Sequence, residues 1–453
     1  MRDARTLALE ILIRCEEDRI PADPVLGPRL AQSGLDERDR RLVTSLVRTT
    51  HRWRGRADRV LDGRLIRGVR SLDARTINIL RLGFIQLFHL DQTPPHAAIH
   101  TSVQMARQLV GEGKGRLVNR ILRDLVSRNP GAREWGSGSG ADSLEGELSH
   151  PSWLIDRWLR RWGEDETRRI CEWNNQAPDF HLRVRGGKDV CRQVRVHLER
   201  EGRAVRPGAV LKEAVRTNGT FPVHQHPLLN EGAITLQDES QMLVAHLWPN
   251  QQTGWILDLC ASPGTKSSHL TELNPQAYVL AADLKIRRLR RIVQTKARLK
   301  LSRLFPLVAD GTRPPFRAAF PRILLDAPCT ALGVLRRRPD TRWLRCPGDI
   351  ADACTTQRRL LEAAAGLVLP GGLLLYSVCT LEPEETDQQI EGFLERHPEF
   401  HLGSLPPLVP EVLHAGPGSV RILPGVLGME GLYAALLQRT GESVPRHPLE
   451  GKA

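Results

Sequence analysis

The chain has 453 residues, of which 40% are hydrophobic, and it carries a formal net charge of +13. This composition excludes a chain that is disordered throughout, and the length suggests about three domains. The positive charge favours a polyanionic partner such as RNA or DNA. Only 8 of the 65 basic residues are Lys, however, and so lopsided a ratio can reflect genome composition as well as function.

The N-terminus and the cysteines indicate where the protein works. The opening residues, M-R-D-A-R-T-L-A-L-E-I-L, contain no apolar signal core, and no run of about 20 apolar residues predicts a membrane span. The eight cysteines are scattered without any C-x-x-C pair, which argues against a zinc site and against a disulfide scaffold. We therefore expect a cytoplasmic protein that binds no metal.

Residues 1–128 are predicted to be all helical, because apolar residues such as Leu7, Ile11 and Leu12 recur at helical spacing. This stretch holds 24 Lys and Arg residues against 15 Asp and Glu residues, a surplus of 24 − 15 = 9. So concentrated a surplus favours an RNA-binding domain over an ordinary solvated face. The helices expected in its second half are Asp73–His89, His96–Val110 and Arg116–Arg128.

Residues 129–147 are rich in Gly and Ser and predict a flexible linker. After it, Leu154, Trp158 and Trp162 recur at helical spacing, which favours a buried stripe over aromatic rings that stack on bases. Short apolar runs then alternate with turns, so 148–235 is predicted to form a small α+β subdomain. Its expected helix is Val190–Arg200.

The most informative single stretch is Trp255–Leu270, W-I-L-D-L-C-A-S-P-G-T-K-S-S-H-L. A strand ending at Asp258, a loop of small residues and a helix are typical of a nucleotide-type α/β domain, in which Gly264 lets the backbone approach a ligand. Cys260 and Thr265 stand where a phosphate-binding P-loop needs its glycines. Taken alone, the stretch fits any turn of a parallel sheet equally well.

Four later strands each end in an acid or a thiol. Because ligands of open α/β sheets bind outside the carboxyl ends of the strands, we expect these side chains to line one cleft. Any one of them could be a helix cap or a small buried cysteine, but their coincidence at one edge favours a catalytic site. Together with Asp258 from the first strand, the six residues are Asp258, Asp283, Asp310, Asp326, Cys329 and Cys379.

These residue types suit specific chemistry. A carboxylate such as Asp283, at the end of the second strand, can accept both hydroxyls of a ribose, and Asp310 suits an adenine edge. A thiolate that adds to carbon-6 of cytosine makes carbon-5 nucleophilic towards the methyl group of S-adenosylmethionine. Asp326 would stabilise the charge near ring nitrogen 3, and a second thiol would assist product release. The residues alone do not say which thiol attacks.

The motifs around these strand ends resemble those of the RNA cytosine-5 methyltransferase family. D-L-C-A-S-P-G-T-K (258–266) is similar to D-x-C-A-A-P-G-G-K, and D-A-P-C-T-A-L-G (326–333) to D-A-P-C-S-x-x-G. R-R-R-P-D-T-R-W (336–343) and Y-S-V-C-T (376–380) match two further motifs of the family. Blocks at 36–58, 80–100 and 117–123 resemble the NusB-type helical domain that is fused to the front of certain members. The resemblance covers nearly the whole chain.

The resemblance implies a multidomain fold. It comprises an N-terminal all-α NusB-like domain, a small α+β subdomain and a C-terminal α/β Rossmann-like methyltransferase domain that uses S-adenosylmethionine. We expect a closing hairpin near the end of the last domain, and a disordered polar tail after it. The predicted bounds are 1–128 for the helical domain, 148–235 for the subdomain, 236–440 for the methyltransferase domain and 441–453 for the tail.

The resemblance also implies roles for individual residues. Cys379 becomes the attacking nucleophile, Cys329 assists release of the product, and Lys266 supports the active site together with Asp326. The expected substrate is small-subunit (16S) rRNA and the expected state is a monomer; a tRNA or another RNA is the alternative substrate. The residues implied to contact the cofactor are Leu259, Cys260, Ala261, Ser262, Pro263, Gly264, Thr265, Asp283, Asp310 and Asp326.

Thr265 departs from the family, which usually has Gly at this position. If the position required a positive φ, a β-branched residue would cost about 1–2 kcal/mol there. Weaker cofactor binding is the expected consequence. Thr265 is also the only sequence support for a second kind of protein, a diverged RNA-binding assembly factor without catalysis.

Overall fold

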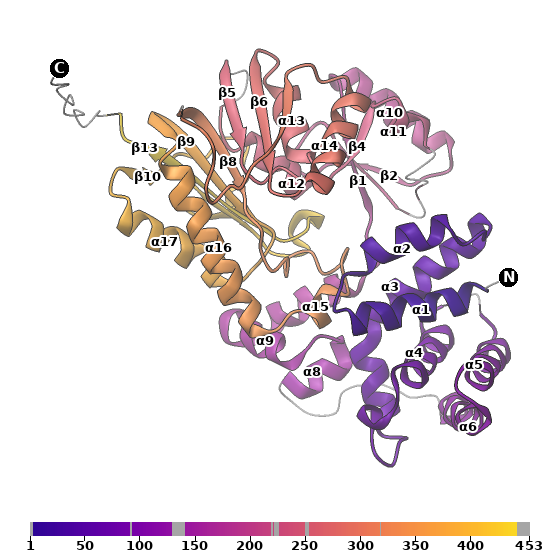
Figure 1. Ribbon diagram of the computed structural model, residues 1–453. Coiled ribbons are helices and arrows are strands. Elements are labelled where there is room, and N and C mark those ends of the chain that lie inside the picture. Colours follow the sequence, from indigo (N-terminus) through magenta and orange to yellow (C-terminus); the bar gives the residue numbers. More distant parts are fainter. Residues whose placement is uncertain are drawn as a thin grey trace, which may run out of the picture. The chain divides into compact units, whose positions relative to one another are not determined.

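The computed structural model describes residues 3–90, 93–128, 141–218, 221, 226–249, 253–317 and 319–441. The chain forms two compact units (Figure 1). The first unit comprises Met1–Ala177 and a later segment, Leu335–Pro347, and the second comprises Pro178–Val334 and Gly348–Ala453. The predicted tail lies outside the described residues from 442 onward.

The first unit is helical, as the sequence predicted. Asp3, Asp36 and Asp73 each accept hydrogen bonds from backbone N–H groups at the start of a helix, which satisfies donors that have no partner inside the helix. Buried leucines, isoleucines and valines from these helices form one core. The helices are α1 (Ala4–Glu17), α2 (Ala22–Ala31), α3 (Glu37–Asp62), α4 (Ala74–Phe88), α5 (Pro95–Leu109) and α6 (Glu112–Arg128), with a 3-10 turn, η1 (Val69–Ser71).

Two more helices of this unit lie where the sequence predicted the linker and the start of the subdomain. Helix α8 (Ala141–Leu148) occupies the end of the stretch predicted as a flexible linker, so the linker prediction is wrong there; residues 129–140 lie outside the described part. Helix α9 (Ser152–Asn175) is also grouped with the first unit, whereas the sequence prediction placed it in the subdomain. Leu154 and Trp158 are fully buried, as expected, whereas Trp162 is only partly buried.

The segment Leu335–Pro347 lies in the first unit although the sequence prediction assigned it to the methyltransferase domain. It contains the short helix α15 (Thr341–Leu344). The guanidinium of Arg342 is fully buried and donates to the carbonyl of Ser149 at 2.9 Å and to Oδ1 of Asn175 at 2.8 Å. Because a buried guanidinium needs such acceptors, the R-R-R-P-D-T-R-W motif is anchored among the helices.

The second unit begins with the predicted α+β subdomain. Its four strands form an antiparallel sheet in the order β2-β3-β1-β4. Leu182 and Val215 of the sheet pack against Val194 and Leu198 of a helix to make a separate core. The elements are β1 (Phe180–Val184), α10 (Lys188–Arg200), β2 (Val205–Pro207), β3 (Ala214–Thr217), α11 (Pro227–Asn230) and β4 (Ile234–Leu236).

A nine-stranded mixed sheet follows in the described chain, with the order β11-β12-β13-β9-β8-β5-β6-β7, and β10 paired to β13. Strands β5 to β9 pair in parallel and the remaining strands pair antiparallel, which includes the expected closing hairpin. The parallel strands are β5 (Gly254–Asp258), β6 (Ala277–Asp283), β7 (Leu304–Val308), β8 (Phe320–Asp326) and β9 (Val368–Val378). The others are β10 (Phe400–Leu402), β11 (His414–Gly416), β12 (Ser419–Ile422) and β13 (Leu432–Arg439).

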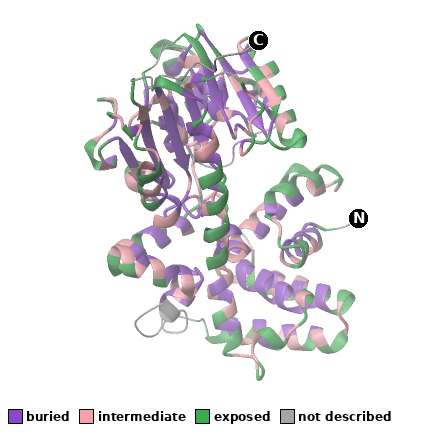
Figure 2. Cartoon of the chain, turned by 60° about the vertical axis from the view of Figure 1, so that its left-hand side comes forward, coloured by how far each residue is buried: buried purple, intermediate pink, exposed green. Residues whose placement is uncertain are grey.

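Helices cover both faces of this sheet, and its strands are largely buried (Figures 1 and 2). Helices α13 (Thr265–Leu273) and α14 (Ile286–Leu299) pack on one face, and α16 (Pro347–Ala365) and α17 (Asp387–Arg396) pack on the other. The chain before β5 forms a short helix, α12 (Glu239–Leu243), and a 3-10 turn, η2 (Val244–His246). Similar turns are η3 (Pro383–Glu385), η4 (Glu411–Leu413) and η5 (Val426–Gly428). In the described chain, no helix is both long and apolar enough to span a membrane.

The strand order changes direction between β5 and β8. From β5 the chain continues outward to β6 and β7, and it then returns to β8 on the other side of β5. Such a switch point opens a crevice at the carboxyl ends of the two central strands, where doubly wound sheets bind their ligands. The topology therefore places the expected site beyond Asp258 and Asp326.

Candidate active site

The acids and thiols singled out in the sequence meet at the carboxyl edge of the parallel strands. Asp258, Asp283 and Asp326 are the last residues of β5, β6 and β8. Asp310 follows β7, and Cys379 directly follows β9. Because these strands are parallel neighbours, all five ends lie at one edge of the sheet.

The loop after β5 is held in place by Asp283. One carboxylate oxygen of Asp283 accepts from the backbone N–H of Ser262 at 3.2 Å, and the other accepts from the N–H of Lys285 at 3.0 Å. Gly264 caps helix α13 with a φ of 97°, and a Cβ there would meet Ile292 at 3.2 Å. Gly264 is thus required both by its backbone conformation and by the close approach of helix α14.

Thr265 does not carry the predicted strain. It is the first residue of α13 and is not among the non-glycine residues with positive φ. The left-handed position belongs to Gly264, directly before it. The expectation of weaker cofactor binding through backbone strain at Thr265 is therefore wrong, and a β-branched residue at the first position of a helix costs little.

Asp258 does not line a cleft, contrary to the sequence prediction. It is fully buried, and its Oδ2 accepts from the hydroxyl of Ser267 in helix α13 at 2.5 Å. Burial, together with the nearby charge of Asp326, raises the pKa of Asp258 to about 7. Its role is to tie the end of the central strand to the helix that follows the loop.

The raised pKa of Asp258 predicts a pH-dependent stability. The folded protein holds this proton up to about pH 7, whereas the usual pKa of Asp is 3.8, so the folded state binds more protons between these values and its stability falls as the pH rises through that window. Asp258→Asn keeps an acceptor for Ser267 and cannot ionise. Thermal unfolding followed from pH 4 to pH 8 should show the variant gaining stability relative to the wild type, and a constant difference would contradict the assignment.

Lys266 and Asp326 form the centre of a polar chain at the edge of the sheet. The ammonium of Lys266, which is almost fully buried, donates to Oδ2 of Asp326 at 2.6 Å and also to the side chain of Gln241. Oδ1 of Asp326 accepts from the hydroxyl of Ser377 at 2.7 Å. The carboxylate of Asp326 is thus fixed from both sides, while its side chain keeps 30% of its surface exposed.

Cys329 and Cys379 lie side by side, with their Sγ atoms 3.4 Å apart. Both are partly exposed. The hydrogen bond to Cys379 and burial raise the pKa of the Cys329 thiol well above its ordinary value. Either sulfur can be the donor in this contact.

The other residues predicted to contact the cofactor differ in their burial and in their hydrogen bonds. The backbone N–H groups of Leu259 and Ala261 donate to carbonyls of neighbouring strands, and burial raises the pKa of the Cys260 thiol. Pro263 is exposed. Asp310 is exposed too, and the hydroxyl and N–H of Thr312 hold the pKa of its carboxyl below the ordinary value.

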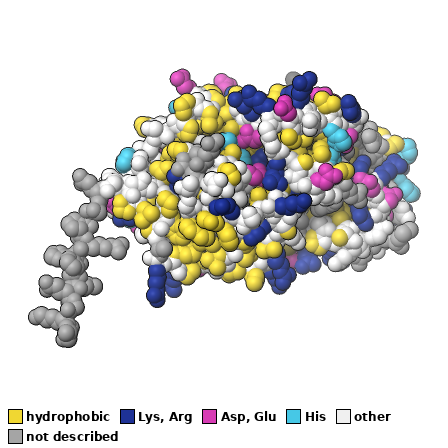
Figure 3. Space-filling model, turned by 90° about the horizontal axis from the view of Figure 1, so that it is seen from above, with side chains coloured by type: hydrophobic (Ala, Val, Ile, Leu, Met, Phe, Trp, Pro, Cys, Tyr) yellow, Lys and Arg dark blue, Asp and Glu magenta, His cyan; other side chains and the backbone are white. Residues whose placement is uncertain are grey.

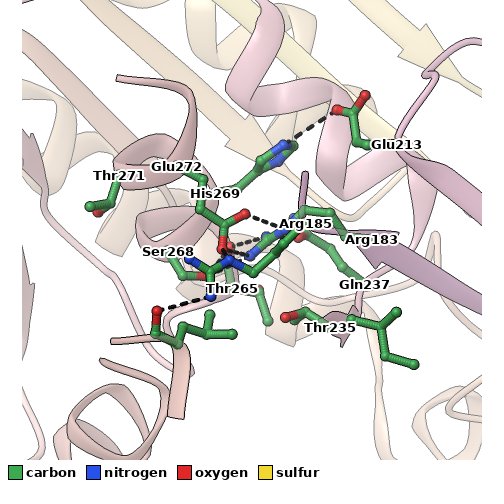
Figure 4. A network of polar contacts seen from close by, with 12 residues as sticks. Arg183, Arg185, Glu213, Thr235, Gln237, Thr265, Ser268, His269, Thr271 and Glu272 are labelled. Carbon is green, nitrogen blue, oxygen red and sulfur yellow. Dashed lines mark hydrogen bonds and ion pairs between the residues drawn. The ribbon is translucent and has the colours of Figure 1, made fainter. Parts of the chain in front are cut away.

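Sequence reasoning missed Arg183, which connects the subdomain to the loop helix (Figure 4). Arg183 lies in β1, is fully buried, and donates to the carbonyl of Thr265 at 2.9 Å and to the hydroxyl of Ser268 at 2.9 Å. It also pairs with Glu272 of the same helix at 3.2 Å. The signal in the sequence was an Arg within an apolar strand, since a charge in that setting needs buried partners.

Three neighbouring side chains in the described part of the chain could hold a metal ion. The possible ligand atoms of Glu213, His246 and His269 all lie within 4.8 Å of one another. However, Nε2 of His246 is already hydrogen-bonded to the carboxylate of Glu213 at 2.6 Å. Burial and then the charge of Arg183 lower the pKa of His269 to about 3, and that same charge repels an added cation. In this structure the carboxylate of Glu213 joins His246 and His269.

Comparison with known proteins agrees with this geometry. Residues 2–127 match the NusB family, 150–224 match the RsmF/B-like ferredoxin-like domain, and 244–438 match the 16S rRNA methyltransferase RsmB/F model. A relative from Bacillus subtilis is 31% identical over 96% of this chain and 99% of its own length. The chain belongs to the 16S rRNA methyltransferase RsmB/F family. The predicted resemblance to RNA methyltransferases of the RsmB/Sun type is confirmed, as is the fold class.

Other similarities also extend over the whole chain. A relative from Synechocystis is 33% identical over 97% of this chain and 100% of its own length. Both relatives are named probable ribosomal RNA small subunit methyltransferase B. Among solved structures, the crystal structure of PH0851 superimposes with a TM-score of 0.80 at 25% identity and covers 97% of this chain and 99% of its own. The front helical domain, the subdomain and the methyltransferase domain thus occur together in all three.

Proposed function

We propose that this protein methylates carbon-5 of a cytosine in small-subunit rRNA, with S-adenosylmethionine as methyl donor and Cys379 as nucleophile. The observation that carries the proposal is the pair of thiols 3.4 Å apart at the strand edge that also holds the Lys266–Asp326 pair. A thiol for addition to carbon-6 and a second thiol that can assist release suit carbon-5 chemistry. The names of the relatives supply the substrate class.

The residues at the edge suit the cofactor by their donor and acceptor chemistry. Asp283 and Asp310 keep further lone pairs that can accept from ribose hydroxyls and from an adenine amino group. Helix α13 begins at Thr265, so its first N–H groups are available for the carboxylate of the donor's amino-acid part. When bound, the cofactor supplies an electrophilic methyl group.

The protein's own residues carry the other steps. The thiolate of Cys379 adds to carbon-6 of the cytosine, which makes carbon-5 nucleophilic. Asp326, held between Lys266 and Ser377, stabilises the charge that develops near ring nitrogen 3. After methyl transfer, Cys329 in its thiolate form takes the proton from carbon-5, and the electrons of that bond expel Cys379 and restore the aromatic ring.

The contact between the two thiols fits this order. Because Cys329 has a raised pKa, it enters the cycle with its proton, and its S–H can donate towards Cys379. A donated hydrogen bond stabilises a thiolate at Cys379, which is the form that attacks. Cys329 becomes the base once its proton has gone to bulk water, and it returns to the thiol form when it takes the proton from carbon-5.

Charge supports a nucleic-acid substrate. Helix α14, which follows directly after Asp283, contains exposed arginines and no acidic residue. Lys and Arg side chains are also spread over the face shown in Figure 3. Such groups neutralise phosphates without reading sequence, so they fit 16S rRNA and a tRNA equally; the family favours the former.

Arg183 is expected to support cofactor binding by holding the loop helix. Arg183→Met leaves the carbonyl of Thr265 and the carboxylate of Glu272 without their buried partner, which should cost roughly 3–5 kcal/mol of stability. Arg185→Met is the matched control, because Arg185 also pairs with Glu272, at 3.0 Å, but is more exposed. Calorimetric titration with S-adenosylmethionine should show weaker binding for Arg183→Met than for the control; equal affinities would remove Arg183 from this role.

The direct test of the proposed function is methylation of purified small-subunit rRNA and tRNA in vitro, with the modified position mapped by bisulfite sequencing. Methyl transfer to carbon-5 of a cytosine in the rRNA is the expected result. Methyl transfer to tRNA alone would show that the substrate is tRNA and not rRNA. Absence of cofactor binding in the calorimeter would favour the non-catalytic assembly factor, whose only sequence support, strain at Thr265, is missing.

A further inference from the structure

A buried carboxylate connects the two loops that carry the thiols. Glu385 lies at the end of the 3-10 turn η3, and its side chain is fully buried. It accepts hydrogen bonds from the residues that directly follow the two cysteines: Thr330 after Cys329, and Thr380 after Cys379. These residues lie in the loops that follow two different strands, β8 and β9, and are joined through this one side chain.

Each carboxylate oxygen of Glu385 accepts two hydrogen bonds. Oε2 accepts from the N–H of Thr330 at 2.9 Å and from Nε2 of Gln357 at 2.9 Å. Oε1 accepts from the hydroxyl of Thr380 at 3.0 Å and from the hydroxyl of Thr330, and the two hydroxyls also lie 2.9 Å from each other. Gln357 donates in addition to the carbonyl of Pro328, the residue before Cys329. Both ends of the Cys329 turn are therefore attached to Glu385, one directly and one through Gln357.

We propose that Glu385 is a positioning residue, which sets the separation of the Cys329 and Cys379 sulfurs through its hydrogen bonds to the loops on which they stand. The two thiols act in turn on the same cytosine ring, at adjacent carbons. Their separation therefore has to match the ring, and misplacement of a reacting group by about 1 Å can cost roughly 100-fold in rate. The inference rests on the proposed function for its catalytic consequence, but the geometry of the thiols can be tested without RNA.

The role depends on hydrogen bonds rather than on charge, and one substitution separates the two. In Glu385→Gln the amide oxygen can take the place of Oε2, facing the two N–H donors. The amide NH₂ then faces the two hydroxyls, which can accept from it. Glu385→Gln therefore keeps the bridge and removes the charge. Glu385→Ala removes the bridge itself.

Two more variants make the comparison specific. Asp387→Ala is the control, because Asp387 begins the neighbouring helix α17 and its carboxylate pairs with Arg421. Thr380→Val keeps the volume of the side chain and removes only its hydroxyl. If Glu385→Ala does not fold, Thr380→Val takes its place as the variant with a weakened bridge.

The thiol geometry is measured with dibromobimane, a short reagent that becomes fluorescent when it bridges two thiols, on the full-length protein without RNA. Cys329→Ser defines the background. We expect Glu385→Ala to bridge at least ~10-fold more slowly than wild type, Thr380→Val to be intermediate, and Glu385→Gln and Asp387→Ala to stay near wild type. Bridging in Glu385→Ala at the wild-type rate, or equal losses in Glu385→Ala and Asp387→Ala, would overturn the proposal.

Methylation kinetics supply the second readout. The loss in Glu385→Ala should fall on kcat, by roughly 10- to 100-fold, with the KM for RNA nearly constant, and Glu385→Gln should recover most of it with the pH profile of the wild type. A shifted pH profile in Glu385→Gln would mean that the charge acts, against the proposal. If the wild type methylates no RNA, the proposed function fails, while the bridging rates still decide the role of Glu385.

Discussion

Replacing Cys379 with alanine is expected to abolish methylation of RNA and to leave the fold and cofactor binding intact. Without the thiolate, carbon-5 of cytosine is not activated, and loss of a covalent nucleophile commonly costs a factor of 10³ or more. The side chain is small and partly exposed, so its removal creates little cavity. Single-turnover transfer of a labelled methyl group to rRNA measures the effect.

The control for this experiment is Cys354→Ala. Cys354 lies in α16, is also partly buried, and its carbonyl rather than its thiol contacts Gln389. This variant should methylate like the wild type, whereas Cys379→Ser should be as inactive as Cys379→Ala, because a hydroxyl is a far weaker nucleophile at neutral pH. Residual activity of Cys379→Ala close to that of the wild type would assign the attack to Cys329 instead.

The edge of the sheet was predictable because its signal is local. Each hydrophobic run ends in a residue such as Asp283 or Asp326, and parallel strands bring such ends together whatever their distance along the chain. The pattern could not show which of these strand-end acids would be buried and which would stay exposed. Asp258 ends its strand in the same way, yet it is buried against Ser267, because that hydroxyl lies within reach of its carboxylate.

The features that sequence reasoning missed depend on distant partners. Arg183, Arg342 and Glu385 are charged and would be expected at the surface, but each is fully buried among acceptors or donors from other elements. Their partners become neighbours only when the strands and helices have packed, so no local pattern identifies these partners. The same reason explains why the sequence did not show that the segment Leu335–Pro347 packs with the helical unit.

Replacing Cys329 with alanine should separate attack from release. The Cys379 thiolate can still add to carbon-6 and the methyl group can still be transferred, but the carbon-5 proton has no base to remove it. Multiple turnover should therefore fall by roughly 10²–10⁴-fold, the usual contribution of a positioned acid or base, while a covalent protein–RNA adduct accumulates. Denaturing gel electrophoresis reveals the adduct as a band of reduced mobility.

The adduct also reports on the order in which the thiols act. It should form in Cys329→Ala, reach one RNA per protein, and disappear in the double variant with Cys379→Ala, because Cys379 supplies the carbon–sulfur bond. The reverse pattern, with adduct in Cys379→Ala alone, would exchange the two roles. Normal turnover of Cys329→Ala would show that a group other than this thiol takes the proton, and the 3.4 Å approach of the two sulfurs would then have no part in product release.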